Sequence, residues 1–296
     1  MRRLLLLLAL AGAALPLATP SLVAQQRVTR KWPLDPDGAV KIHDYRGRVR
    51  VSGWDRDTIA VSATMPAGHT LLGGGSRSAV KIAVEGPDLG NVGVVDLEVR
   101  VPAGAQVWVR GAATDIDVSG LIGTVDLATV SGDVLVRGAP RTITAESMNG
   151  TVNVSASCET LRAKTSAGPL LWEGSARDAQ LSTVSGPVRV GAGPLERVTI
   201  ESVTGDVTLE SALRADTRLM IETHGGNVGL RFPARTPLRL DADAARMQVP
   251  GKPPRTREGS ARFAPVLWDF NVVAGRAAPQ VTVRSFTGAL RLGFGP

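Results

Sequence analysis

Residues 127–154, LATVSGDVLVRGAPRTITAESMNGTVNV, decide the fold because they contain one short pattern twice. The first copy is LATVSGDVLV (127–136) and the second is AESMNGTVNV (145–154). The pattern recurs four more times, with spacings of 18, 18, 18, 19 and 21 residues between the aligned glycines Gly132, Gly150, Gly168, Gly186, Gly205 and Gly226. Self-similarity at a short, nearly constant period is typical of proteins that stack one structural unit on the next.

Each unit is predicted to contain two β-strands around a turn. After the first glycine, Val134 and Val136 are apolar positions two residues apart, and before it Val125 and Leu127 alternate in the same way. Period-two alternation predicts strands with one buried face. Dipeptides such as Asn149-Gly150 are turn signals.

A constant period predicts an all-β fold, a parallel β-helix (β-solenoid) with about 18 residues per coil. Equivalent side chains would then stack ~4.8 Å apart, so that Val134, Val152 and Val188 form part of a buried column. The alternative is a sandwich of antiparallel hairpins, but three successive intervals of 18 argue against it. A second column carries hydroxyl groups that we expect to satisfy turn backbone groups: Thr129, Ser147, Thr165, Thr183, Ser202 and Thr223.

The N-terminus has the features of an export signal. Arg2 and Arg3 precede an apolar run over residues 4–15, and small residues follow. We predict a signal peptide over residues 1–24 with cleavage after Ala24, or alternatively after Ala18; an uncleaved anchor is the other interpretation. The mature protein would lie in the periplasm, on the cell surface or outside the cell, without a membrane-spanning segment.

The remaining chain is predicted to form one continuous domain over residues 27–296. We expect an N-terminal cap with irregular leading coils over 25–110 and regular coils over 111–232. Prolines interrupt residues 233–280, which are interpreted as a basic surface insertion, and the final strands follow at 281–296.

Several short motifs resemble the bacterial putative-adhesin β-strand-repeat family. They are Val101-Pro102-Ala103-Gly104, DIDVSGL (115–121), TVSGDV (129–134) and, near the start, GRVRVSGWD (47–55). The resemblance spans roughly residues 40–295. It implies a right-handed, single-stranded β-helix in the cell envelope, and it brings no active site with it.

No catalytic constellation is evident in the sequence. The only histidines are His43, His69 and His224, without the spacing of a zinc site, and the single cysteine, Cys158, cannot form an intramolecular disulfide. We therefore expect a non-enzymatic binding protein without a cofactor. The alternatives are a polysaccharide-active β-helix lyase or hydrolase and a self-assembling structural element.

Two groups of residues are candidate ligand sites. Asp115 and Asp133 occupy equivalent places in adjacent units with Asp117 beside them, so stacked carboxylates could hold Ca²⁺, although solvated turn aspartates are the commoner case. Trp54 and Trp108 could stack on carbohydrate or simply pack in the cap.

The charge distribution suggests an anionic partner. The chain carries a formal net charge of +7, and residues 231–262 contain eight basic against three acidic residues. Nucleic acid is not expected outside the cytoplasm, so we predict an envelope component, carbohydrate or anionic polymer, bound by a monomer. The candidate contacts are Lys252, Arg255, Arg257 and Arg262, with a solvated loop as the alternative.

Overall fold

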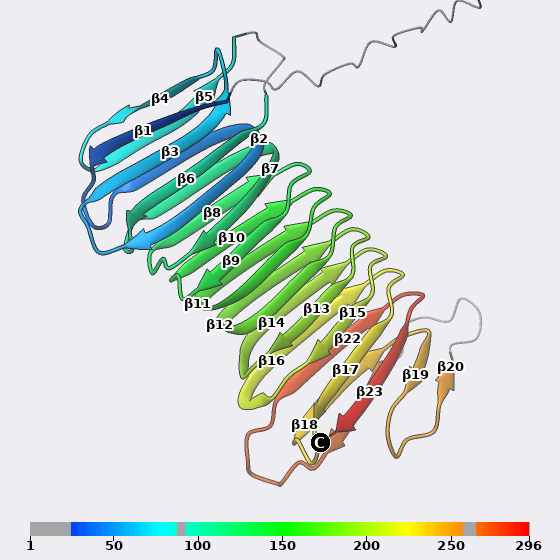
Figure 1. Ribbon diagram of the computed structural model, residues 1–296. Helices are drawn as coiled ribbons and strands as arrows, with labels where there is room; N and C mark the ends of the chain where they lie inside the picture. Colours follow the sequence, from blue (N-terminus) through cyan, green and yellow to red (C-terminus); the bar gives the residue numbers. More distant parts are fainter. Residues whose placement is uncertain (1–24, 88–92, 257–264, 296) are drawn as a thin grey trace, which may run out of the picture.

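The computed structural model describes residues 25–87, 93–256 and 265–295, and these ranges contain strands and turns but no helix. The predicted all-β fold is therefore confirmed. Figure 1 shows the strands stacked along one long axis. No helix in these ranges could cross a membrane. The predicted signal peptide, residues 1–24, lies outside the described residues.

The centre of the molecule is a stack of parallel strands. They are β7 (Gln106–Ser119), β8 (Thr124–Thr129), β9 (Val134–Gly138), β10 (Thr142–Ser147), β11 (Val152–Thr165), β12 (Leu170–Thr183), β13 (Val188–Ala192), β14 (Leu195–Ser202), β15 (Val207–Glu210), β16 (Leu213–Thr223) and β17 (Val228–Pro233). Paired residues are 18 apart in the regular part: Ile143 of β10 pairs with Val125 of β8 and Leu161 of β11. The predicted period therefore appears directly in the strand register.

Five of these strands form a closed ring of parallel pairings, in the order β7, β8, β10, β11, β9 and back to β7. The ring closes because β7 and β11 are long. Residues 107–110 of β7 pair with β8, whereas residues 116–119 pair with β9. One continuous strand therefore contributes to two faces of the molecule.

The interior of the stack is aliphatic. Val134, Val152, Leu170 and Val188 pair in sequence across β9, β11, β12 and β13, and each is at most 1% exposed. Trp172, two residues after Leu170 on the same face of β12, is also fully buried. Burying aliphatic side chains contributes ~1.5–3 kcal/mol each, so this column stabilises the stack.

The repeated glycines are required by close backbone packing. A Cβ atom built on Gly150 would overlap the carbonyl oxygen of Gly132, and one built on Gly168 would overlap that of Gly150. The same clash recurs up the stack at Gly186, Gly205, Gly226 and Gly288. Each glycine therefore lets the turn of one repeat rest directly on the turn before it.

The hydroxyl column supports the glycine turns. Ser147 Oγ donates to the carbonyl oxygen of Gly132 (2.8 Å) and accepts from the backbone N–H of Gly150 (3.0 Å). Thr223 likewise accepts from Gly226 N–H at 2.9 Å. The prediction is confirmed in part, because the buried hydroxyl oxygens of Thr165 and Thr183 have no hydrogen-bond partner within the described ranges.

The N-terminal part mixes parallel and antiparallel strands. It comprises β1 (Gln25–Pro33), β2 (Ala39–Trp54), β3 (Thr58–Pro66), β4 (Thr70–Gly75), β5 (Ala79–Glu85) and β6 (Val95–Pro102). β2 runs parallel to β5, β6 and β7 and so joins this part to the stack. β1, β3 and β4 pair antiparallel with their neighbours and lie beyond β2 and β6 (Figure 1).

The C-terminal strands are interleaved. They are β18 (Leu238–Asp243), β19 (Arg246–Gln248), β20 (Arg255–Thr256), β21 (Val266–Phe270), β22 (Gln280–Ser285) and β23 (Ala289–Gly295). β22 lies between β16 and β18, and β23 lies between β17 and β19. The interpretation of residues 233–280 as a surface loop is wrong for residues 238–249, because Leu238, Leu240, Ala242 and Met247 are buried in the core.

Candidate binding surfaces

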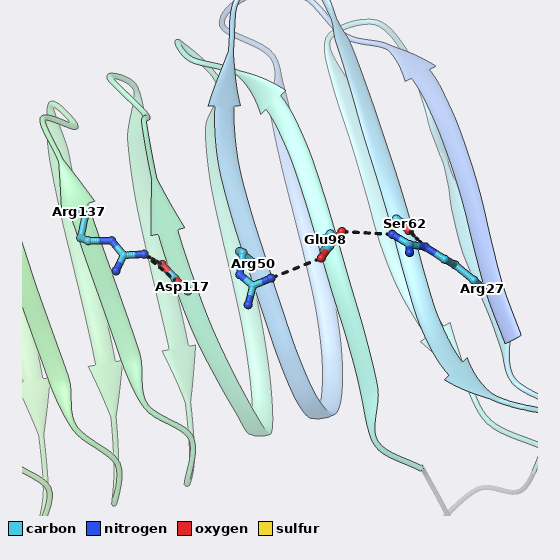
Figure 2. Close-up of polar contacts among 6 residues, drawn as sticks. All are labelled: Arg27, Arg50, Ser62, Glu98, Asp117 and Arg137. Carbon is cyan, nitrogen blue, oxygen red and sulfur yellow. Dashed lines mark hydrogen bonds and ion pairs between the residues drawn. The ribbon is translucent and has the colours of Figure 1, made fainter. Parts of the chain in front are cut away.

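Ion pairs connect neighbouring strands on the outer face. Figure 2 shows Arg137 reaching both carboxylate oxygens of Asp117, at 2.8 and 3.0 Å, and Arg50 reaching Glu98 at 3.5 Å. Arg27 approaches the same glutamate at 3.5 Å and bonds to Ser62. Exposed pairs of this kind contribute ~0–1 kcal/mol each, so they neutralise the surface more than they stabilise it.

The three predicted calcium ligands have structural partners. Asp115 Oδ1 accepts from the backbone N–H of Asp133 (3.1 Å), and Asp133 Oδ1 accepts from that of Thr151 (2.7 Å). Asp117 is held by Arg137. Within the described ranges no three His, Cys, Asp or Glu side chains gather as a metal site would require. These contacts explain the aspartates as supports of the next turn, and calcium binding stays a prediction.

The two candidate tryptophans lie in different places and are both half-buried. Trp54 donates its indole N–H to the carbonyl oxygen of Thr58 (2.8 Å), and the Arg56 guanidinium lies 5.2 Å from its ring centroid. The Lys41 ammonium lies 5.9 Å from the Trp108 centroid. One face of each ring is therefore near a cation, and the structure does not bring the two rings into one platform.

The predicted basic contacts are described only in part. Lys252 is half-buried, with its ammonium 5.8 Å from the Phe270 ring centroid, and Arg255 is exposed on β20, where it pairs with Met247 of β19. Arg257 and Arg262 lie outside the described residues. We call residues 246–256 the basic arm; Figure 1 shows its strands β19 and β20 at the side of the stack.

The cysteine and histidine side chains that could act in catalysis are poorly suited to it. Burial raises the pKa of the Cys158 thiol to about 11, so the reactive thiolate is disfavoured. Burial is the largest cause of the lowered pKa of His43, and the positive charges of Lys81, Arg110 and Lys41 lower it further. His69 Nε2 accepts from Gly93 N–H at 3.1 Å. These groups lie apart and do not form a nucleophile–base pair.

Asp44 has a buried carboxylate, which lowers the stability of the folded state at neutral pH. It is 3% exposed; Oδ2 accepts from the Thr114 hydroxyl (2.8 Å), whereas Oδ1 has no partner within the described ranges. Burial is the main cause that raises its pKa. A raised pKa in the folded state favours the protonated form, so this residue's contribution to stability is greatest below the pKa of the unfolded chain and declines as pH rises.

We expect Asp44→Asn to raise the thermal midpoint at pH 7, because the amide keeps an acceptor for Thr114 without a buried charge. The difference from the original protein should shrink as pH falls toward 4. Calorimetry at several pH values measures both effects, and Asp55→Asn, at an exposed site, is the control. A variant that is less stable at pH 7 would contradict this explanation.

Sequence reasoning missed an exposed apolar ridge. Val130, Met148, Val184, Val203 and Phe286 each lie two residues before a repeat glycine and are 45–54% exposed. His224, at the same position of its own repeat, stacks on Phe286 with ring centroids 5.0 Å apart. The repeat alignment contains the signal, but apolar residues at these positions look like core until the turns are placed.

Sequence reasoning also missed a hollow lined by arginines. It is lined by residues of β12, β14, β16, β18 and β22 and by residues 276–278, and has a volume of about 490 Å³. The positively charged residues at its rim are Arg177, Arg197, Arg218, Arg239 and Arg276. They are spread over residues 177–276 of the sequence, and the folded chain brings them together.

Comparison with known proteins supports the fold. No family model and no curated protein matches the chain. A crystal structure of a protein from Parabacteroides merdae, described as a putative adhesin, matches with a TM-score of 0.53 and 10% identity over 90% of this chain and 96% of that one.

Two other solved structures score lower. A protein from Bacteroides fragilis, also described as a putative adhesin, has a TM-score of 0.41 at 12% identity and covers 91% of this chain and 98% of its own. A protein from Parabacteroides distasonis, described as a putative lipid binding protein, has a TM-score of 0.45 at 9% identity. That match covers 90% of this chain and 96% of the other. Scores below 0.5 support no inference. At the level of the fold, the chain therefore agrees with a solved structure described as a putative adhesin, as its resemblance to the putative-adhesin family implies.

Proposed function

We propose that this is an exported, non-catalytic protein of the cell envelope that presents a rigid β surface for adhesion or binding to an anionic envelope polymer. In this proposal the chain winds as a right-handed, single-stranded parallel β-helix with about 18 residues per coil. The 18-residue register between β8, β10 and β11 supports that winding.

Rigidity is supported by the packing of the stack. The aliphatic column is continuous from β9 to β13, and the glycine turns rest on one another without intervening side chains. Such a surface loses little conformational entropy when it binds, which favours affinity. Export is supported by the features of residues 1–24 in the sequence.

The positive charge of the basic arm is the main reason for proposing an anionic partner. Arg255 is exposed on β20, outside the stack, where a polymer could reach it. In the sequence Arg257 and Arg262 follow closely, so the local charge is strongly positive. Clustered positive charge attracts polyanions and raises their rate of association. The raised pKa of Cys158 argues against nucleophilic catalysis.

We expect Arg255→Ser combined with Arg257→Ser to elute from a heparin column at lower salt than the original protein, because exposed charge contributes to polyanion binding at low ionic strength. The control is Arg30→Ser combined with Arg100→Ser, which removes the same charge at exposed sites on β1 and β6. Elution of the arm variant at the original salt concentration would remove the arm from the proposal.

A further inference from the structure

The arginine hollow lies at the opposite ends of the strands from the glycine turns. Arg197 is near the start of β14 and Arg218 is near the middle of β16, whereas the glycines follow the ends of these strands. The hollow has a volume of about 490 Å³, and no aromatic residue lines it. A ligand held there is therefore recognised by charge and hydrogen bonding rather than by ring stacking.

Strand register aligns the charges. Arg197 pairs with Asp178 on one side and with Arg218 on the other. Arg218 then pairs with Gln280, and Gln280 with Arg239. Neighbouring strands lie ~4.8 Å apart, so the row offers a guanidinium at successive strands with one amide between them. Directly paired residues of parallel strands also point to the same side of the sheet.

Much of the negative charge around the hollow is already engaged. Asp178 pairs with Arg197 at 2.9 Å, and Asp269 pairs with Arg239 at 3.8 Å. Glu196 and Asp216, which line the hollow, both pair with Arg214, at 3.3 and 3.1 Å.

Three guanidiniums remain uncompensated. Arg177, Arg218 and Arg276 are exposed and have no ion-pair partner within the described ranges. A bound anion would neutralise these three charges.

From this arrangement we propose that the hollow binds a linear acidic polysaccharide through its carboxylate groups. Guanidinium forks bind carboxylates with two parallel hydrogen bonds. Several guanidinium groups around one hollow suit anionic groups repeated along an extended chain. Arg218 and Arg276 are the principal contacts. The inference rests on the proposed binding function but assigns it to a second surface, away from the basic arm.

The test is calorimetric titration with polygalacturonate, a linear polysaccharide with one carboxylate on each sugar. We expect Arg218→Ser combined with Arg276→Ser to weaken binding about tenfold, since net hydrogen bonds to charged groups are lost. The pair Arg30→Ser and Arg100→Ser, with the same loss of charge, should bind as the original protein does. Circular dichroism establishes that each variant is folded.

Other outcomes overturn the inference in distinguishable ways. If only the Arg255→Ser and Arg257→Ser variant binds more weakly, the polymer contacts the basic arm; the proposed function stands and the hollow site does not. If neutral dextran binds equally well, recognition by charge is wrong. If inorganic polyphosphate binds and polygalacturonate does not, the assignment to an acidic polysaccharide is wrong.

Discussion

Replacing Gly150 by alanine should lower the free energy of unfolding by on the order of 4 kcal/mol, in the range of the most damaging single substitutions. The added Cβ would overlap the carbonyl oxygen of Gly132, and that oxygen belongs to the backbone of the neighbouring turn. The overlap can be removed only if the turn at Gly150 moves away from the turn at Gly132. Separation would weaken the bond from Ser147 Oγ to the carbonyl oxygen of Gly132 and the pairing of β9 with β11.

Urea denaturation followed by circular dichroism measures the effect. Gly229→Ala is the matched control, because Gly229 lies in strand β17 of the same stack and the nearest atom to its added Cβ is Val207 O at 4.0 Å. We expect the control to change stability by less than ~1 kcal/mol. If both variants lost the same free energy of unfolding, steric contact between the turns would not be the reason that glycine is required at position 150.

Ending the chain at Pro279 should unfold the C-terminal part of the stack. The deletion removes β22 and β23, which together bury Val281, Val283, Leu290 and Leu292. At ~1.5–3 kcal/mol for each side chain, the direct loss is roughly 6–12 kcal/mol. The deletion also removes the strands that pair in parallel with β16, β17, β18 and β19. Residues 238–249 therefore lose their attachment to the stack.

We expect the shortened protein to be cut by protease within residues 213–279 and to associate on a sizing column, because open strand edges pair with other chains. A pair of point variants tests the same contacts without deletion. Val283→Asp should reproduce much of the effect, since Val283 is fully buried, whereas Thr282→Asp, on the outward side of β22, should not. A monomeric, protease-resistant truncated protein would show that β22 and β23 are dispensable.

The regular stack could be predicted because its causes are local and repeated. Val134 and Val152 are recognisable as inward positions from period-two alternation alone, and the 18-residue interval then pairs them. Gly150 and Ser147 are recognisable as a turn from the same alignment. Each repeat provides the same information again, so one irregular unit does not obscure the pattern.

The C-terminal strands and the binding surfaces could not be predicted in the same way. Nothing local shows that Val281 of β22 pairs with both Leu219 of β16 and Leu240 of β18, because these contacts join segments that differ in period. The prolines around residues 250–254 suggested a loop and concealed the buried strands before them. Asp115 and Asp133 looked like ligands because their backbone partners lie in the following repeat.

The interleaving of β22 and β23 also sets the order in which the molecule can be completed. A ribosome makes residues 238–249 before residues 280–292, yet the earlier segment rests on the later one. Growth from the N-terminus can add each repeat to the one before it until β17, but β18 and β19 must then wait for strands not yet synthesised. During translation, that intermediate would expose Leu238, Leu240 and Met247 to chaperones.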